Sequence, residues 1–239
     1  MFALSRPALS SPVLIDIYEY HKFPPMVVSQ DKSIGLSFAF ARYLSNVSNG
    51  RYQFNINLVS MGSLQSRLKQ GQPAVVLFVN PIWFNDVEQE QYFWSEPVLT
   101  LKDEIVSVKD KPFSFSAAED YVGKRIGGIK GYTYPILDSL VKDGKAQRID
   151  AEGDLQNLKR LHKVGDLDAI IVNEGPLKFY SQLLGIQSEL FISPKPSGVY
   201  QVRILVTKDQ SDVFSFIQSL VENMDEDEAW LEIKNLYLP

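Results

Sequence analysis

The chain has 239 residues, enough for one large domain or two modest ones. Hydrophobic residues make up 45% and charged residues 22%, which is typical of a globular protein with a substantial core. The net charge of −5 argues against nucleic-acid binding, which needs a basic face, and no apolar run reaches the roughly 18 residues of a membrane span. The lack of cysteine excludes disulfides, zinc–thiolate sites and cysteine nucleophiles.

Residues 1–11 lack the basic start and apolar stretch of a signal peptide. Two explanations remain open from the residues alone: a cytoplasmic protein, or a mature chain whose signal peptide has been removed. The absence of cysteine is compatible with an oxidising compartment and does not decide between them.

Strands and helices are predicted to alternate along the first half of the chain. The apolar run 12–18 has the composition of a buried strand and ends in the aromatic, proline-stiffened loop Tyr20–Pro25. The polar break Lys109–Pro112 is interpreted as a crossover into a second part. The other elements expected before this break are a helix near Ile34–Ser45, a strand at Tyr52–Val59, a helix capped by Ser63 and ended by Gly71, and strands at Ala74–Val79 and Ile105–Val108.

The second half repeats the alternation of strand and helix. Its elements are a strand at 125–129, a helix at Pro135–Lys142 stopped by Gly144, a helix capped by Asp154 and ended by Gly165, a strand at Asp168–Val172, a helix at Pro176–Leu184, a long strand at Val199–Val206, a helix capped by Ser211 and a last helix holding Trp230. This alternation predicts an α/β architecture with mainly parallel sheets.

Four local patterns carry a family resemblance that covers most of the chain, from about Val13 to Leu238. They are the loop Tyr20–Pro25, the helix start Gly35–Ala41 with Ser37 where Asp is common, the blocks Ser63–Val76 and Phe93–Pro97, and the second-half segments Gly123–Thr133 and Gly165–Ala169. In this order and spacing they resemble the extracytoplasmic solute-binding proteins of ABC importers, of the family-3 type best known for polar amino acids.

The resemblance implies a two-lobed periplasmic-binding-protein-like (type II) fold, in which each lobe is a mainly parallel sheet flanked by helices. Lobe 1 would be discontinuous, residues 1–108 plus 204–239, and lobe 2 would span residues 109–203, with two hinge strands joining them. It also implies a periplasmic, monomeric binding protein that needs no cofactor or metal and serves an ABC permease or a membrane sensor.

The resemblance suggests where lobe 1 would contact a solute. Phe23 corresponds to the family's ligand-stacking aromatic, although an aromatic beside two prolines is also a common loop plug, and Tyr20 lies beside it. Asn80 follows a strand where the family offers a polar group. Trp83 lies just beyond, as a ligand wall or a plug at the lobe edge.

Lobe 2 would contribute Tyr132 and Thr133, at an expected helix N-terminus that favours an anion or needs only a cap. The family's carboxylate-binding Arg has no counterpart, since Pro81–Trp94 contains neither Arg nor Lys and the matching position falls on Asn85 or Glu88. The family's amine-binding Asp is replaced by Asn173, with Glu174 beside it. We therefore expect a neutral, aromatic or mono-charged solute in place of an ordinary amino acid.

Two alternatives to a binding protein remain open. One is an enzyme on the same fold, similar to dehydratases that act on cyclic acids, with Glu174 as a general acid. The other is a sensory or interaction module whose cleft binds little. His21 and His162 are the only histidines, fall in different expected lobes and lack the spaced partners of a metal site.

Overall fold

The computed structural model describes residues 11–238, so all but the last residue of the segment tested for a signal peptide lies outside the described part. The chain divides into two compact units: unit 1 holds the described residues up to Leu99 together with Gln201–Leu238, and unit 2 holds Thr100–Tyr200. The expected boundaries, 108/109 and 203/204, fall further along the chain. The difference arises because the strand expected at Ile105 begins at Leu99, so the polar break at Lys109 follows the far end of a strand of unit 2.

Ten strands and seven α-helices are found in the described residues. The strands are β1 (Val13–Glu19), β2 (Tyr52–Leu58), β3 (Val75–Val79), β4 (Phe93–Trp94), β5 (Leu99–Val108), β6 (Arg125–Ile129), β7 (Gln147–Ala151), β8 (Ala169–Asn173), β9 (Leu190–Ile192) and β10 (Gly198–Val206). The helices are α1 (Leu36–Val47), α2 (Met61–Lys69), α3 (Pro135–Lys142), α4 (Asp154–Lys159), α5 (Glu174–Leu184), α6 (Ser211–Val221) and α7 (Glu228–Tyr237).

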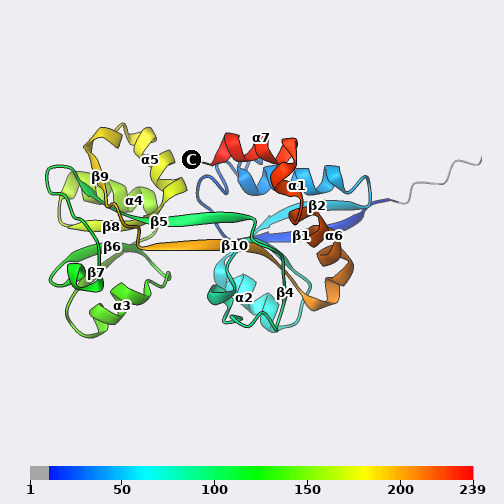
Figure 1. Ribbon diagram of the computed structural model, residues 1–239, viewed down its shortest axis with the longest axis horizontal. Coiled ribbons are helices and arrows are strands. Elements are labelled where there is room, and N and C mark those ends of the chain that lie inside the picture. The colour runs from blue at the N-terminus through cyan, green and yellow to red at the C-terminus, as the bar shows by residue number, and fades with distance from the viewer. Residues whose placement is uncertain (1–10, 239) are drawn as a thin grey trace, which may run out of the picture. The chain divides into compact units, whose positions relative to one another are not determined.

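In unit 1 the sheet order is β2-β1-β3-β10, and β4 pairs with β10. β1 runs parallel to both β2 and β3, whereas β10 returns antiparallel to β3. Helices α1 and α7 lie side by side on one face of the sheet, and α2 lies on the other (Figure 1). The Phe40 and Trp230 rings, 5.2 Å apart, join α1 to α7. Because β3 is buried along its whole length, its continuous apolar run matches a central strand covered on both faces.

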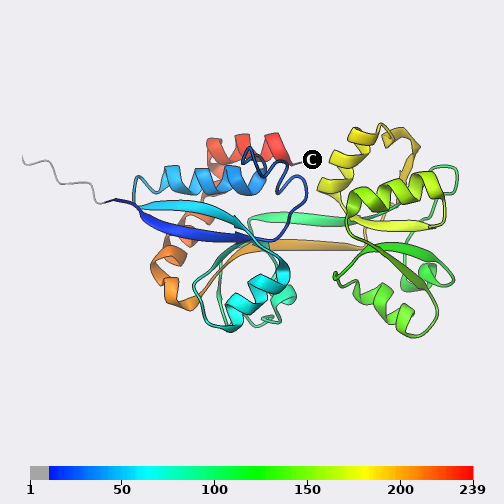
Figure 2. The same cartoon turned by 180° about the vertical axis from the view of Figure 1, so that it is seen from behind.

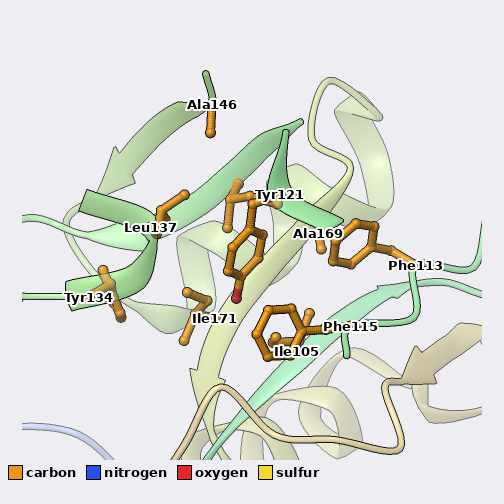
Figure 3. Packing of buried hydrophobic residues seen from close by; sticks show 10 residues of the cluster. Ile105, Phe113, Phe115, Tyr121, Tyr134, Leu137, Ala146, Ala169 and Ile171 are labelled. Carbon is orange, nitrogen blue, oxygen red and sulfur yellow. The ribbon is translucent and has the colours of Figure 1, made fainter. Parts of the chain in front are cut away.

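In unit 2 the order is β5-β8-β6-β7, with β9 paired to β5. Helix α3 lies on one face of this sheet, and α4 and α5 lie together on the other (Figure 2). The core on the α3 side is built around Tyr121, whose ring stacks 4.8 Å from that of Phe115 and 6.0 Å from that of Phe113 (Figure 3). Such aromatic packing between apolar strand residues and α3 gives unit 2 a core of its own.

The starts of several helices differ from the predictions. The cap of α2 is Ser60, which has an extended backbone and accepts a hydrogen bond from Ser63 N–H, so the expected cap is itself the capped residue. Asp154 and Ser211 are the first residues of their helices and not their caps. The alternation also continues through β7 and β9, two strands that the sequence pattern did not indicate.

Gly35 is the one helix start in unit 1 where glycine is required. Its φ of +144° lies in a region that other residues avoid, and a Cβ there would collide with the Met26 carbonyl oxygen. This close approach seats the loop after β1 against the start of α1, and it explains why the family-like helix start Gly35–Ala41 opens with glycine.

Candidate functional site

The end of β1 carries a fully enclosed carboxylate. Glu19 has no exposed surface, and its side chain accepts hydrogen bonds from the Ser37 hydroxyl at 2.5 Å and from the His21 backbone N–H at 2.7 Å. The ring atom Nδ1 of His21 lies 3.2 Å from the same carboxylate. Ser37, which the sequence showed only as a departure from the family pattern, therefore acts as a donor to Glu19.

Three of the predicted ligand-binding residues gather around His21. The His21 ring lies 4.0 Å from the Tyr20 ring, 5.5 Å from the Phe23 ring and 6.2 Å from the Trp83 ring, measured between centroids. Tyr20 and Phe23 follow β1, and Trp83 follows β3, its parallel neighbour. The carboxyl ends of neighbouring parallel strands thus bring together an aromatic cluster, which is the usual place for a ligand in an α/β sheet.

Asn80 and Asn85 flank a short 3-10 helix, Pro81–Phe84, that carries Trp83. Asn80 caps this helix: its Oδ1 accepts from Ile82 N–H at 3.0 Å and its Nδ2 donates to the Gln201 carbonyl at 2.8 Å. Asn85 ends the helix in a left-handed conformation with φ 54°, and its side chain is exposed. Both asparagines therefore have structural roles in positioning Trp83.

The loop after this helix is organised by Asp86. Its buried carboxylate accepts hydrogen bonds from three backbone N–H groups, those of residues 90–92, and from the Trp94 indole at 2.7 Å. Burial acts to raise the pKa of Asp86, but these hydrogen bonds outweigh it and the pKa is lowered. Glu88, the other candidate for the position of the family's Arg, is exposed in this loop.

In unit 2 the predicted residues Asn173 and Glu174 form the start of α5. Asn173 caps the helix by accepting from Gly175 N–H at 3.2 Å, and its Nδ2 donates to the Lys102 carbonyl at 3.1 Å and to Asp103 Oδ1 at 3.2 Å. The Glu174 carboxylate lies 4.0 Å from Lys102 Nζ. The hydrogen bonds of the Asn173 side chain therefore link β5 to the junction between β8 and α5.

Two further carboxylates in unit 2, Asp103 and Asp154, interact electrostatically. Burial raises the pKa of Asp154 to about 6, with a contribution from the negative charge of Asp103. Burial also raises the pKa of Asp103; the Asn173 hydrogen bond opposes the shift and the charge of Glu174 adds to it. This part of unit 2 is acidic: Asp103 interacts with both Asp154 and Glu174, and Lys102 is paired to Glu174.

Tyr132 and Thr133 are exposed in the turn between β6 and α3. Thr133 does not cap α3, because the helix begins at Pro135 and the capping position is Tyr134. The Tyr134 N–H donates to Asp138 Oδ2 at 2.8 Å, and the Tyr134 hydroxyl accepts from Ile129 N–H at 3.0 Å. Asp138 therefore provides the capping interaction that the sequence assigned to Thr133.

Two surface hollows in unit 1 lie away from the predicted residues. One, of about 590 Å³, is open to solvent between the ends of β1 and β2 and helix α2, with Tyr18, Ser60 and Arg67 among its lining residues. The other, of about 450 Å³, is lined by Arg51 and by α6. Neither contains a residue predicted to bind the solute.

The sequence analysis did not identify Glu19, Asp86 or Asp103 as candidate functional residues. It considered His21 only as a metal ligand and rejected that role. A signal existed for Glu19, since a carboxylate directly after an apolar strand run must be hydrogen-bonded or lie beside a functional site, whereas Asp103 stands between Lys102 and Glu104, outside the expected strand. Asp86 gave none, because an aspartate in a polar loop looks the same whether it organises the loop or faces water. Among the described residues no cluster of three or more metal-ligating side chains occurs, and no helix is long and apolar enough to span a membrane.

No protein-family model and no curated protein matches the sequence. Solved structures match nearly the whole chain. An ancestral arginine-binding protein bound to arginine is 17% identical, with a TM-score of 0.74 over 96% of this chain and 100% of that one. The substrate-binding protein of an amino acid ABC transporter is 16% identical, with a TM-score of 0.68 over 94% and 98%. AncCDT-1, an ancestral amino acid-binding protein and precursor of cyclohexadienyl dehydratase, is 13% identical, with a TM-score of 0.71 over 95% and 96%.

The chain therefore has the fold of the family-3 solute-binding proteins, an α/β periplasmic-binding-protein fold. The similarity extends over full-length binding proteins and confirms the fold class expected from the order of the sequence motifs. At these identities it establishes the fold, and the activity of this chain has to be argued from its own residues.

Proposed function

We propose that this protein is an extracytoplasmic solute-binding protein, which binds a small polar or aromatic solute and presents it to an ABC permease or a membrane sensor. The observation that carries the proposal is the whole-chain similarity in fold to binding proteins, 96% of this chain against 100% of an arginine-binding protein. The aromatic cluster at the carboxyl ends of β1 and β3 supports it, because aromatic walls with a few polar groups are typical of small-molecule sites.

The solute we propose is neutral or carries one charge. Pro81–Trp94 contains no Arg or Lys that would bind a carboxylate. Asn173 cannot form the ion pair that an aspartate would make with an amine, and its amide is already bonded to Lys102, Asp103 and Gly175. A zwitterion would then leave a desolvated charge without a partner, which is costly. We propose Phe23, Trp83 and Tyr20 as the solute-binding residues of unit 1, and Tyr132, Thr133 and Glu174 as those of unit 2.

A thermal-shift screen tests this function. The screen contains amino acids, organic acids, aromatic acids and amines, each at millimolar concentration. A compound present at about 100 times its Kd adds about 2.7 kcal/mol to the free energy of unfolding, which gives a clear rise in Tm. Hits are confirmed by calorimetry. Failure of every class to raise Tm would favour the module that binds little over a transport protein.

An enzyme on the same fold is the second candidate, and one observation favours it. Burial raises the pKa of Asp154 to about 6, which lies near the working range of a general acid. Incubation of the protein with cyclic hydroxy acids, followed by chromatography, tests this alternative. Turnover that is lost in Asp154→Asn or Glu174→Gln would establish the enzyme; binding without turnover supports the transport function.

A further inference from the structure

The negative charge of Glu19 has no basic side chain to neutralise it apart from His21. Its carboxylate contacts the Ser37 hydroxyl and His21, and no ion pair with Lys or Arg is found for it among the described residues. A buried carboxylate can remain ionised when several donors surround it. A negative charge held in this way makes its immediate surroundings attractive to a cation.

The position of Glu19 determines which nitrogen of His21 carries the proton. Nδ1 is enclosed, lies 3.2 Å from Glu19 Oε1 and forms no hydrogen bond within the described part of the chain, so this carboxylate is the charged group that the buried nitrogen meets. A lone pair on Nδ1 would face the oxygen lone pairs of the carboxylate in a water-free space, which is repulsive. The proton therefore belongs on Nδ1. In the neutral ring the second nitrogen, Nε2, is then a hydrogen-bond acceptor.

Nε2 is positioned differently from Nδ1. It makes no hydrogen bond to any described residue, and it is not among the enclosed polar atoms, so it reaches solvent. The rings of Tyr20, Phe23 and Trp83 surround the same imidazole. Aromatic rings attract cations through their electron-rich faces, and a neutral imidazole nitrogen accepts from an N–H group.

We propose that His21 is the specificity-determining residue of unit 1: its Nε2, held as an acceptor by Glu19, binds the ammonium group of an aromatic or aliphatic amine that lacks an α-carboxylate. This assignment rests on the proposed solute-binding function and narrows it to one class of solute. Glu19 is the positioning residue, since it acts through His21, and Ser37 holds Glu19 in place.

The first test needs no ligand. Imidazole nitrogen NMR at mildly alkaline pH distinguishes a protonated from a bare ring nitrogen, and the chain has only two histidines, so the variant His162→Phe assigns both spectra. We expect His21 with Nδ1 protonated and Nε2 bare, and in Glu19→Gln a shift of the proton toward Nε2. A wild-type spectrum with the proton on Nε2 overturns the proposal, and this holds even if Glu19→Gln fails to fold.

The second test uses three probes of similar shape and different charge: phenethylamine, phenethyl alcohol and phenylacetate. We expect phenethylamine alone to shift the Nε2 resonance, and His21→Phe to weaken its binding about 10- to 100-fold by calorimetry while His162→Phe leaves its Kd unchanged. Binding of phenylacetate at Nε2, or equal affinity of His21→Phe for phenethylamine, overturns the assignment.

Failure of the inference can be told apart from failure of the proposed function. If none of the three probes moves the Nε2 resonance while another class of solute raises Tm in the broad screen, the protein binds solutes and the amine assignment is wrong. If no compound in either experiment binds, the solute-binding function itself is refuted and the amine assignment falls with it.

Discussion

Asp154 shows how a single half-buried carboxylate makes stability depend on pH. Its pKa is raised from 3.8 to about 6, so the folded protein binds more protons than the unfolded chain between these two values. Stability then falls as pH rises through that window, and the penalty persists above it.

We predict that Asp154→Asn stabilises the protein at neutral pH, since the amide keeps the volume of the side chain and cannot ionise. The gain is expected to be of the order of 1–2 kcal/mol, less than the roughly 3 kcal/mol that two pH units represent, because the side chain keeps contact with water. Denaturant unfolding measured from mildly acidic to neutral pH tests this. The curves of variant and wild type should converge toward acid pH; parallel curves would contradict the prediction.

At the scale of elements, the loop after the Pro81–Phe84 helix depends on one side chain. Asp86→Ala removes the acceptor of the Trp94 indole and of three backbone N–H groups, so we expect a loss of about 2–4 kcal/mol in the free energy of unfolding. Glu88→Ala, an exposed carboxylate in the same loop, is the matched control and should change stability by less than about 0.5 kcal/mol.

The low pKa of Asp86 adds a pH signature to this comparison. A carboxyl whose pKa is depressed contributes stability that is fully present above its ordinary range and is lost as the pH falls through the folded-state value. The difference between wild type and Asp86→Ala should therefore shrink in strong acid. If the difference in unfolding free energy between wild type and Asp86→Ala does not change with pH, the variant loses stability through packing alone.

The start of α3 offers a second prediction at this scale. Asp138→Ala removes the acceptor of the Tyr134 N–H and one of the two carboxylate partners of Arg148, and we expect it to cost about 1–2 kcal/mol. Thr133→Ala should leave the stability of the unliganded protein within about 0.5 kcal/mol, because Thr133 is exposed and is not the cap. Thermal unfolding of the two variants decides, and a large loss in Thr133→Ala would reverse the assignment.

The same elements show what could be predicted from the sequence. Helical and strand periodicity located α3 at Pro135–Lys142 and most of the strands along the chain, because burial of one face imposes a repeat that the residues display. Helix caps were less accessible, since Ser60 and Ser63 carry the same hydroxyl and only the backbone conformation shows which one caps. Contacts between distant segments, such as that of Glu19 with Ser37, arise from the tertiary fold and leave no local pattern.

At the scale of the whole molecule, the similarity in fold suggests an amino acid as the solute, whereas the residues of this chain argue against it. The similar structures include an arginine-binding protein, yet Pro81–Trp94 of this chain contains no Arg or Lys, and Asn173 stands where we expect the aspartate that would bind an amine. We predict that Arg, His, Gln and Glu bind weakly or not at all, with no heat of binding at micromolar concentration in calorimetry. Micromolar affinity for any of them would show that the Asn85 or Glu88 alignment is wrong.

The chain leaves unit 1 at Leu99 and returns to it at Gln201, so unit 2 is an insertion within unit 1. During synthesis at the ribosome, all of Thr100–Tyr200 emerges before Gln201–Val206, the part of β10 that lies in unit 1 and pairs with β3 and β4. Unit 2 can then complete its core while unit 1 still lacks an inner strand. We therefore expect unit 2, in the middle of the chain, to fold first. The N-terminal part of unit 1, although it is synthesised first, should reach its native structure later.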